Sequence, residues 1–322
     1  MNNTKTIAII GNGNLGTAIY NGLLNHHNKY SSENISLLGR GYFDTDPRAG
    51  ILSEQVKPLK NFEAIILAVK PVDCISCLSL MKDKIHPDLM LISTVSGLSI
   101  DIQTRMLKLR HSHVAKTTLD TNVEQGLGTI VCCAENKAFN EVQEIFTPVS
   151  KKIVQKSGDG VINGVTIVGS GKAFFLKHIY MHMEKFPKDL FSENLMKLTI
   201  NDPFIKEYIK VVKSACKKIF NDDSLVQISC EGTLEAIQKS CHSLEDILLE
   251  IERVATKGGS TETKINNFDS PEKVTEKFFT EGFSVVNKKV RSFKKNIYND
   301  YKEWHKIMIQ KSSVYHMPKK LW

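Results

Sequence analysis

The chain has 322 residues, of which 41% are hydrophobic and 24% charged, and its net charge is +8; the composition is that of an ordinary globular protein, and the length predicts two domains. No apolar run of about 18 residues is present to span a bilayer, and a glycine-rich segment interrupts the apolar N-terminus before it resembles a signal peptide, so we expect a soluble, cytoplasmic protein without membrane contact. The seven cysteines argue against a disulfide framework, and the positive charge fits an anionic cofactor and substrate at least as well as nucleic acid.

The first half of the chain alternates apolar runs with segments of helical length. Residues 6–10 form an apolar run, a glycine turn follows, and residues 17–24 continue with the apolar spacing of a helix. Six further runs have the length of strands: 35–38, 64–69, 89–93, 113–115, 129–133 and 152–154. Runs that are apolar throughout are typical of parallel sheets covered on both faces, so we predict a Rossmann-type parallel sheet domain over residues 1–160.

The second half changes to long helical patterns at 172–185, 204–220, 229–240, 243–256 and 271–288. The sharp interruption among them is the hydroxyl-rich turn Lys257-Gly258-Gly259-Ser260-Thr261. The expected fold class is therefore α/β, with an all-α domain over residues 161–290 after the sheet domain. Residues 291–322 form a basic C-terminal extension, for which a solvated end is favoured over a binding arm.

The glycine loop after the first strand predicts a dinucleotide site. Gly11 permits the tight turn, Gly13 lets the backbone approach a pyrophosphate, and Gly16 lets the helix pack closely on the strand. Asn14 and Leu15 open the helix, whose N-terminal amides can bind phosphate. The loop lies between a strand and a helix, with a second strand at the correct distance, and this context favours nucleotide binding over a purely structural turn.

The end of the second expected strand indicates which dinucleotide is preferred. It reads Leu38-Gly39-Arg40, without the acidic residue that binds the ribose 2′-hydroxyl of NAD. A guanidinium can pair with a 2′-phosphate, so NADP(H) is expected in preference to NAD(H), and Arg40 as a plain surface residue remains the alternative.

Cys74 and Cys77 have the CxxC spacing of redox and metal sites. No second ligand pair is found elsewhere in the sequence, so we predict buried helical cysteines and no metal site.

Five blocks in register resemble pyrroline-5-carboxylate reductases: IAIIGNGNLGTAI at the N-terminus, ILAVKPVD at 66–73, STVSGLSI at 93–100, GSGKAF at 169–174 and VATKGGSTE at 254–262. The resemblance covers roughly residues 6 to 290. It implies an NAD(P)-dependent oxidoreductase that reduces 1-pyrroline-5-carboxylate to L-proline by hydride transfer to a cyclic imine, in proline biosynthesis. It also implies that the helical domain holds the substrate and forms a homodimer or larger homo-oligomer.

The resemblance assigns roles in the helical half. Thr261 falls where a threonine hydroxyl binds the ring nitrogen, as the catalytic group, while Thr256, Gly259, Ser260 and Thr261 fall where the substrate carboxylate is held. Ser170 begins the first long helix near the cleft. A Gly-Gly turn with a helix cap, and simple capping by Ser170, are the structural alternatives.

In the sheet half the resemblance places Ala68, Val69, Lys70 and Pro71 along the ribose and nicotinamide side of the cofactor. Pro71 ends a strand at its carboxyl edge, where ligands of such sheets bind. A strand end with proline as a stop is the alternative interpretation.

Two departures from the family pattern concern the cleft. Segment 116–122 lacks the family's asparagine and both of its prolines, with Thr118 as a candidate for the asparagine's place, and Lys172 replaces the proline of a Gly-Ser-Gly-Pro-Ala block. The chain is also longer than the family around residues 187–223. The alternatives are therefore a diverged member that binds NADP(H) but acts on another imine or keto acid, or one without catalysis.

Overall fold

The computed structural model describes residues 4–26, 28–39, 58–255, 261 and 265–315. Its first half is built around one sheet of seven strands in the order β2-β1-β3-β4-β5-β6-β7. The strands are β1 (Ile7–Ile10), β2 (Ile35–Leu38), β3 (Ala64–Leu67), β4 (Met90–Ser93), β5 (Val114–Leu119), β6 (Gly128–Cys133) and β7 (Ser150–Gln155). Each strand matches an apolar run of the sequence, which confirms the expected sheet.

Strand β6 departs from the expected parallel arrangement. It pairs antiparallel with β5, with Thr118 opposite Val131, whereas all the other neighbours are parallel. The connection between Leu119 and Gly128 holds only the short 3₁₀ helix η5 (Thr121–Gln125). A parallel pair needs a crossover of about a dozen residues or more, so this connection returns the chain in the opposite direction.

Alternate residues of the central strands face two different hydrophobic layers. Ala8 and Ile10 of β1 pack in one layer with α2 (Cys74–Met81) and α3 (Ile100–Leu107). Ile7 and Ile9 pack in the other with α1 (Asn14–His26) and α4 (Asn136–Phe146). Because both faces of the sheet are covered, β1 and β3 are apolar at every position.

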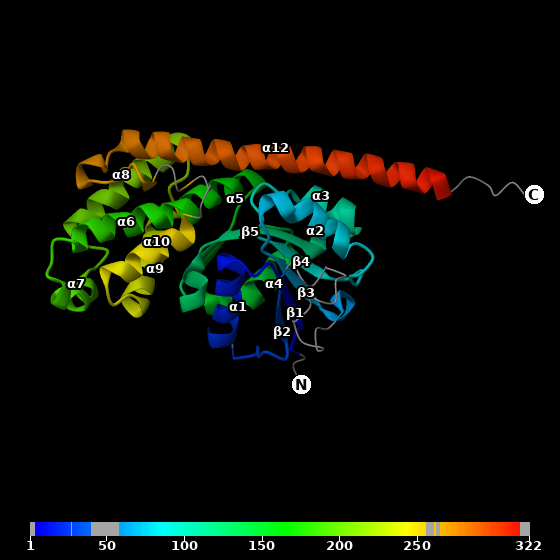
Figure 1. The fold of residues 1–322 in the computed structure, drawn as a ribbon, viewed down its shortest axis with the longest axis horizontal. Coiled ribbons are helices and arrows are strands. Elements are labelled where there is room, and N and C mark those ends of the chain that lie inside the picture. Colours follow the sequence, from blue (N-terminus) through cyan, green and yellow to red (C-terminus); the bar gives the residue numbers. More distant parts are fainter. Residues whose placement is uncertain (1–3, 27, 40–57, 256–260, 262–264, 316–322) are drawn as a thin grey trace, which may run out of the picture.

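The helical half begins directly after β7 and lies beside the sheet half in Figure 1. Its helices are α5 (Gly158–Gly164), the π-helical turn η7 (Val165–Ser170), α6 (Gly171–Met183), α7 (Phe191–Lys197), α8 (Pro203–Phe220), α9 (Val226–Ser240) and α10 (Leu244–Val254). Its core is rich in aromatic rings, four of which surround Phe174 edge-on at 5.8–6.1 Å: Phe268, Phe278, Phe279 and Phe283. Short 3₁₀ turns complete the chain at Leu59–Asn61, Pro71–Asp73, His111–His113, Thr147–Val149, Lys188–Leu190 and Pro271–Lys273.

Helix α12 (Glu276–Tyr315) crosses both halves of the molecule (Figure 1). Phe279 and Phe283 pack in the helical core, whereas Ile297 and Tyr301 pack against the sheet domain with α2 and α3. The backbone of α12 approaches Gly97 closely: a Cβ on Gly97 would lie 2.7 Å from the backbone nitrogen of Lys294.

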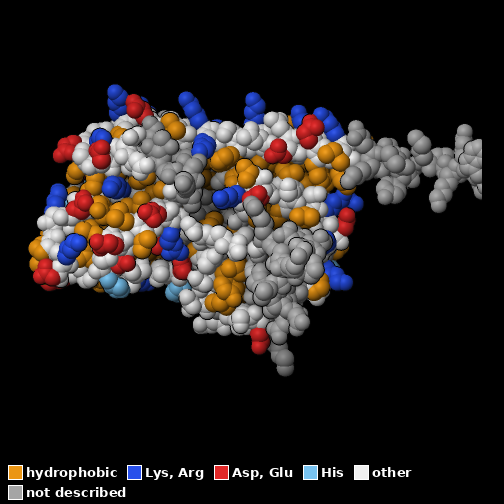
Figure 2. All heavy atoms as spheres, in the orientation of Figure 1, with side chains coloured by type: hydrophobic (Ala, Val, Ile, Leu, Met, Phe, Trp, Pro, Cys, Tyr) orange, Lys and Arg blue, Asp and Glu red, His pale blue; other side chains and the backbone are white. Residues whose placement is uncertain are grey.

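The C-terminal segment therefore differs from the solvated extension expected from its charge. One face of α12 is buried as far as Tyr301, and Lys and Arg side chains stand out along its opposite face, at the upper edge of Figure 2. The expected helix of 271–288 is thus only the first part of a helix that runs through residue 290, and the division into domains at that point stays a prediction.

The CxxC pair is part of the core. Cys74 and Cys77 are buried in α2, and burial raises the pKa of each thiol to about 12, so both stay protonated at neutral pH. Across the described ranges, no three or more His, Cys, Asp or Glu side chains gather as a metal site would require. Within the same ranges, every helix is too short or too polar to cross a bilayer.

Candidate active site

The glycine loop connects β1 to α1 at the carboxyl edge of the sheet. Gly11 has φ of +117°, and a Cβ there would lie 2.5 Å from the carbonyl oxygen of Ala68. At Gly16 a Cβ would lie 1.7 Å from the carbonyl oxygen of Gly11, so only glycine lets the helix start this close to the strand. Gly13 faces open space, with no atom within 4 Å of a Cβ. The loop is thus closed on the protein side and open where a pyrophosphate would approach.

A cleft of about 610 Å³ lies over this loop. Gly11 and Gly13 line it from one side, and Ala68, Val69 and Lys70 line it at the end of β3. Helix α2 contributes its far wall through Ser76, Cys77 and Leu80. The volume is in the range of small-molecule and cofactor sites, and the lining matches the cofactor segments expected from the sequence.

Three other residues expected at the cofactor lie near this cleft. Asn14 and Leu15 form the first turn of α1, and Leu15 is partly packed against the hydrophobic layer below it. Pro71 opens the 3₁₀ turn that leads into α2. Arg40 lies outside the described residues, as do Thr256, Gly259 and Ser260.

Two hydroxyl groups expected at the substrate lie against each other in the helical half. The hydroxyls of Ser170 and Thr261 are 2.8 Å apart, although the residues are 91 positions apart in the chain. Both side chains are buried, with 5% and 6% of their surface exposed. Ser170 directly precedes α6 without capping it by a side-chain hydrogen bond, so its hydroxyl is committed to Thr261 and not to the helix. Capping of α6 by the Ser170 side chain, the structural alternative, is therefore not observed, and the substrate role of Ser170 stays a prediction.

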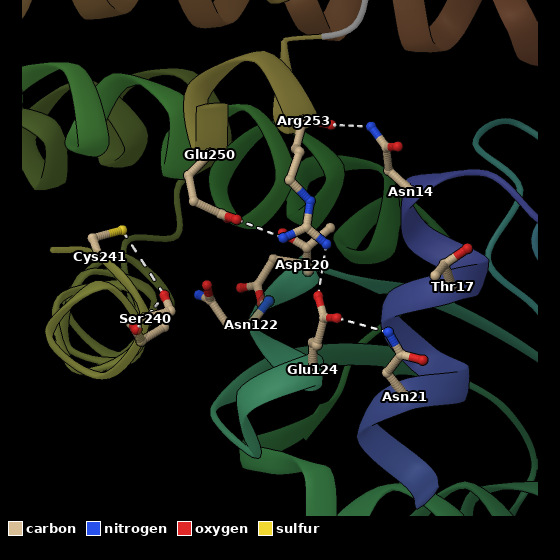
Figure 3. Close-up of polar contacts among 12 residues, drawn as sticks. Asn14, Thr17, Asn21, Asp120, Asn122, Glu124, Ser240, Cys241, Glu250 and Arg253 are labelled. Carbon is tan, nitrogen blue, oxygen red and sulfur yellow. Dashed lines mark hydrogen bonds and ion pairs between the residues drawn. The ribbon is translucent and has the colours of Figure 1, made fainter. Parts of the chain in front are cut away.

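A group of charged side chains at the junction of the two halves is a feature that the sequence did not predict (Figure 3). Arg253, in the last turn of α10, donates to a Glu250 oxygen at 2.5 Å and to a Glu124 oxygen at 2.6 Å. Asn21 of α1 donates to the other Glu124 oxygen at 2.8 Å. The i,i+3 spacing of Glu250 and Arg253 indicates a helical ion pair, but the partner 129 positions away has no signal in the sequence.

Lys172, one of the departures from the family pattern, belongs to the same group. Its Nζ lies 3.2 Å from a Glu250 oxygen and 2.6 Å from the hydroxyl of Thr121, which is in the other altered segment. The Lys172 side chain is only 2% exposed. The two departures from the family pattern therefore contact each other in the fold.

Asp120 is the buried acid of this junction. It is fully enclosed, and burial raises its pKa to about 7, while the charge of Lys172 and the backbone amides of Asn122 and Thr129 act in the opposite direction. One of its oxygens accepts the amide of Asn122 at 2.9 Å, and the other has no hydrogen-bond partner within the described residues. Asp120 therefore holds a proton at a pH where an exposed aspartate would not.

Together the fold and the site indicate the class of protein, an NAD(P)-dependent oxidoreductase. The features that indicate it are a sheet covered on both faces, a glycine loop with one open side, a cleft at the carboxyl edge and a helical half with paired hydroxyls. A family model described as NADP oxidoreductase, coenzyme F420-dependent, matches residues 6–97. The chain is 24% identical over 273 residues to the pyrroline-5-carboxylate reductase of Methanobrevibacter smithii, covering 82% of this chain and 96% of that one. Over most of its length the chain is therefore similar to pyrroline-5-carboxylate reductases, as a diverged relative.

Solved structures agree with this fold. The NADP-bound pyrroline carboxylate reductase of Plasmodium falciparum superposes with a TM-score of 0.53 at 16% identity, covering 91% of this chain and 99% of that one. The pyrroline-5-carboxylate reductase of Coxiella burnetii superposes with a TM-score of 0.50 at 18% identity, over 90% and 99% of the two chains.

Proposed function

We propose that this protein reduces 1-pyrroline-5-carboxylate to L-proline with NADPH. The observation that supports this most directly is the buried Ser170–Thr261 hydroxyl pair, in the helical half that packs on the helix of the glycine loop. The names of the relatives point to the same substrate.

In the proposed reaction the nicotinamide supplies a hydride to the imine carbon, and the ring nitrogen takes up a proton. The Thr261 hydroxyl donates a hydrogen bond to that nitrogen, and Ser170 orients the hydroxyl from behind. Thr256, Gly259 and Ser260 hold the carboxylate through hydroxyl and amide donors.

The cofactor site on this proposal comprises Gly11, Gly13, Asn14, Leu15, Gly16, Ala68, Val69, Lys70 and Pro71, with Arg40 on the 2′-phosphate. The cleft over the glycine loop, with its open side at Gly13, supports a dinucleotide in this place. We expect kcat/KM to be higher with NADPH than with NADH, and Arg40→Gln to remove most of that difference. If the ratio of kcat/KM with NADPH to kcat/KM with NADH is unchanged in Arg40→Gln, Arg40 does not bind the 2′-phosphate and is a plain surface residue.

The deciding assay follows NADPH oxidation with 1-pyrroline-5-carboxylate. Thr261→Ala is expected to lower kcat by about 10²- to 10⁴-fold, the usual contribution of a positioned proton donor, while NADPH affinity measured by calorimetry stays the same. Thr104→Ala is a matched control, because Thr104 is equally buried and donates to a backbone carbonyl at 3.1 Å in α3, outside the cleft.

Each outcome of the assay discriminates between the alternatives. An unchanged kcat in Thr261→Ala would remove Thr261 from the reaction. Tight NADPH binding by the unaltered protein without turnover of this substrate would contradict the proposed reaction, and a panel of other imines and keto acids would then separate a changed substrate from a protein without catalysis.

A further inference from the structure

A series of polar contacts connects the helix of the glycine loop to Lys172 at the start of α6, two positions along the chain from Ser170 of the buried hydroxyl pair. On the sheet side, Asn14 of α1 donates to the backbone carbonyl of Arg253 at 3.0 Å, and Glu124 accepts from both Asn21 and the Arg253 guanidinium. The first helix of the sheet half is therefore bonded twice to the end of α10, directly and through Glu124.

On the helical side the same guanidinium continues the series. Arg253 donates to one oxygen of Glu250, whose other oxygen accepts from Lys172 at the start of α6. Lys172 is two positions from Ser170, which holds the hydroxyl of Thr261. Arg253 is thus the residue that joins Glu124 of the sheet half to Glu250 of the helical half (Figure 3).

The charged side chains of this series are largely shielded from solvent, which favours their ion pairs. Side-chain exposure is 35% for Arg253, 21% for Glu124 and 18% for Glu250. Burial alone would raise the pKa of Glu124 and of Glu250, but their ion pairs and hydrogen bonds outweigh it and hold both below the usual value. Removing one partner would leave a partly buried charge unpaired, so the contacts persist while the protein is folded.

The guanidinium is suited to this place by its shape. Its two terminal nitrogens point to two carboxylates on different elements, η5 and α10. A lysine carries the same charge on a single nitrogen and cannot keep the fixed fork between two carboxylates. The position therefore requires arginine geometry in addition to positive charge.

We propose that Arg253 is a positioning residue, which sets the Ser170–Thr261 hydroxyl pair at a fixed place relative to the helix of the cofactor loop. The inference rests on the proposed function, because the hydroxyl pair is useful only if an imine lies between it and the nicotinamide. A displacement of about 1 Å between a reacting group and its partner can cost about 100-fold in rate.

The test compares Arg253→Lys, which keeps the charge, with Arg253→Gln, which removes it. We expect kcat for the imine to fall about 10-fold in Arg253→Lys and about 100-fold in Arg253→Gln, with the Kd for NADPH changed less than about threefold. Arg110→Gln is the matched control, because Arg110 pairs with Asp88 at 2.6 Å in an exposed place outside the cleft. It should leave kcat unchanged.

A second measurement does not depend on the substrate. The amide of Ala255 bonds to the carbonyl of Ile251 at 2.8 Å, and we expect its hydrogen exchange to be at least about 10-fold faster in both Arg253 variants than in Arg110→Gln. If the ion pairs of Arg253 hold the end of α10 in place, their loss speeds hydrogen exchange at Ala255 whether or not the protein reduces this imine.

The two readouts keep the inference separate from the proposed function. If the unaltered protein does not reduce the imine, the proposed function fails, and the exchange rate at Ala255 still tests whether Arg253 tethers α10. An unchanged exchange rate overturns the inference, and so does faster exchange with kcat unchanged in a protein that is active. If Arg253→Gln does not fold, Arg253→Lys alone provides both measurements.

Discussion

Gly13 differs from the two glycines beside it in having space for a side chain. Gly11 and Gly16 face backbone atoms too closely for a Cβ, whereas nothing lies within 4 Å of one on Gly13. The sequence predicted that all three are needed, and only the structure separates the two that the fold requires from Gly13, which the fold does not require.

Gly13→Ala is therefore expected to fold normally and to bind NADPH at least about 10-fold more weakly, because the new methyl group occupies the path of the pyrophosphate. Calorimetry gives the affinity and thermal unfolding the stability. Gly282→Ala is the control, since its Cβ would also meet nothing within 4 Å, and normal NADPH affinity in Gly13→Ala would contradict the placement of the pyrophosphate.

Asp120 provides a prediction on stability and pH. Its folded-state pKa of about 7 lies above the ordinary value of 3.8, so as pH rises from about 4 to about 7 the unfolded chain loses this proton first and stability falls. Asp120→Asn stays neutral and avoids this cost. The variant should therefore gain about 2 to 4 kcal/mol of unfolding free energy relative to the unaltered protein between pH 4 and pH 7.

Urea unfolding at the two pH values measures this difference. Asp300→Asn replaces an exposed aspartate on α12 and should change stability by less than about 0.5 kcal/mol at either pH. A pH-independent difference between Asp120→Asn and the unaltered protein would mean that Asp120 is ionised in the folded state throughout this range.

Among the elements, α12 shows best what a local pattern misses. Its buried positions Phe279, Phe283, Ile297 and Tyr301 follow one helical stripe, but Lys and Arg side chains between them make the segment read as a basic tail. Long basic side chains can line a buried stripe on its solvent side, so net charge did not reveal the packing. The helical spacing of these buried apolar residues was the feature of the sequence that indicated the packing of α12.

Ile297→Ala should lower the free energy of unfolding by about 2 to 4 kcal/mol, because Ile297 is buried between α12 and the sheet domain. Ile307→Ala makes the same change at a half-exposed position of the same helix and should cost less than about 1 kcal/mol. Equal effects in denaturant titrations would show that the C-terminal half of α12 is not part of the folded core.

At the scale of the whole molecule, we propose a homodimer or larger homo-oligomer, as the family resemblance implies. Large apolar side chains remain exposed on the helical half, among them Leu190, Met196 and Leu249. Light scattering should therefore give a mass of at least twice the 36.2 kDa of one chain. A monomer at the concentrations used for assay would count against carrying the family's substrate site over to this protein.

The amino-acid sequence by itself determined the strands, most helix positions and the glycine loop, because apolar periodicity and the steric demands of glycine act over a few neighbouring residues. It also carried the resemblance to pyrroline-5-carboxylate reductases, through five short blocks in order. Tertiary structure decided the antiparallel direction of β6, the packing of α12 on the sheet half and the meeting of Lys172, Glu250 and Arg253 with Glu124. These depend on groups far apart in the chain, whose contacts are selected by burial and charge pairing once both halves are in place.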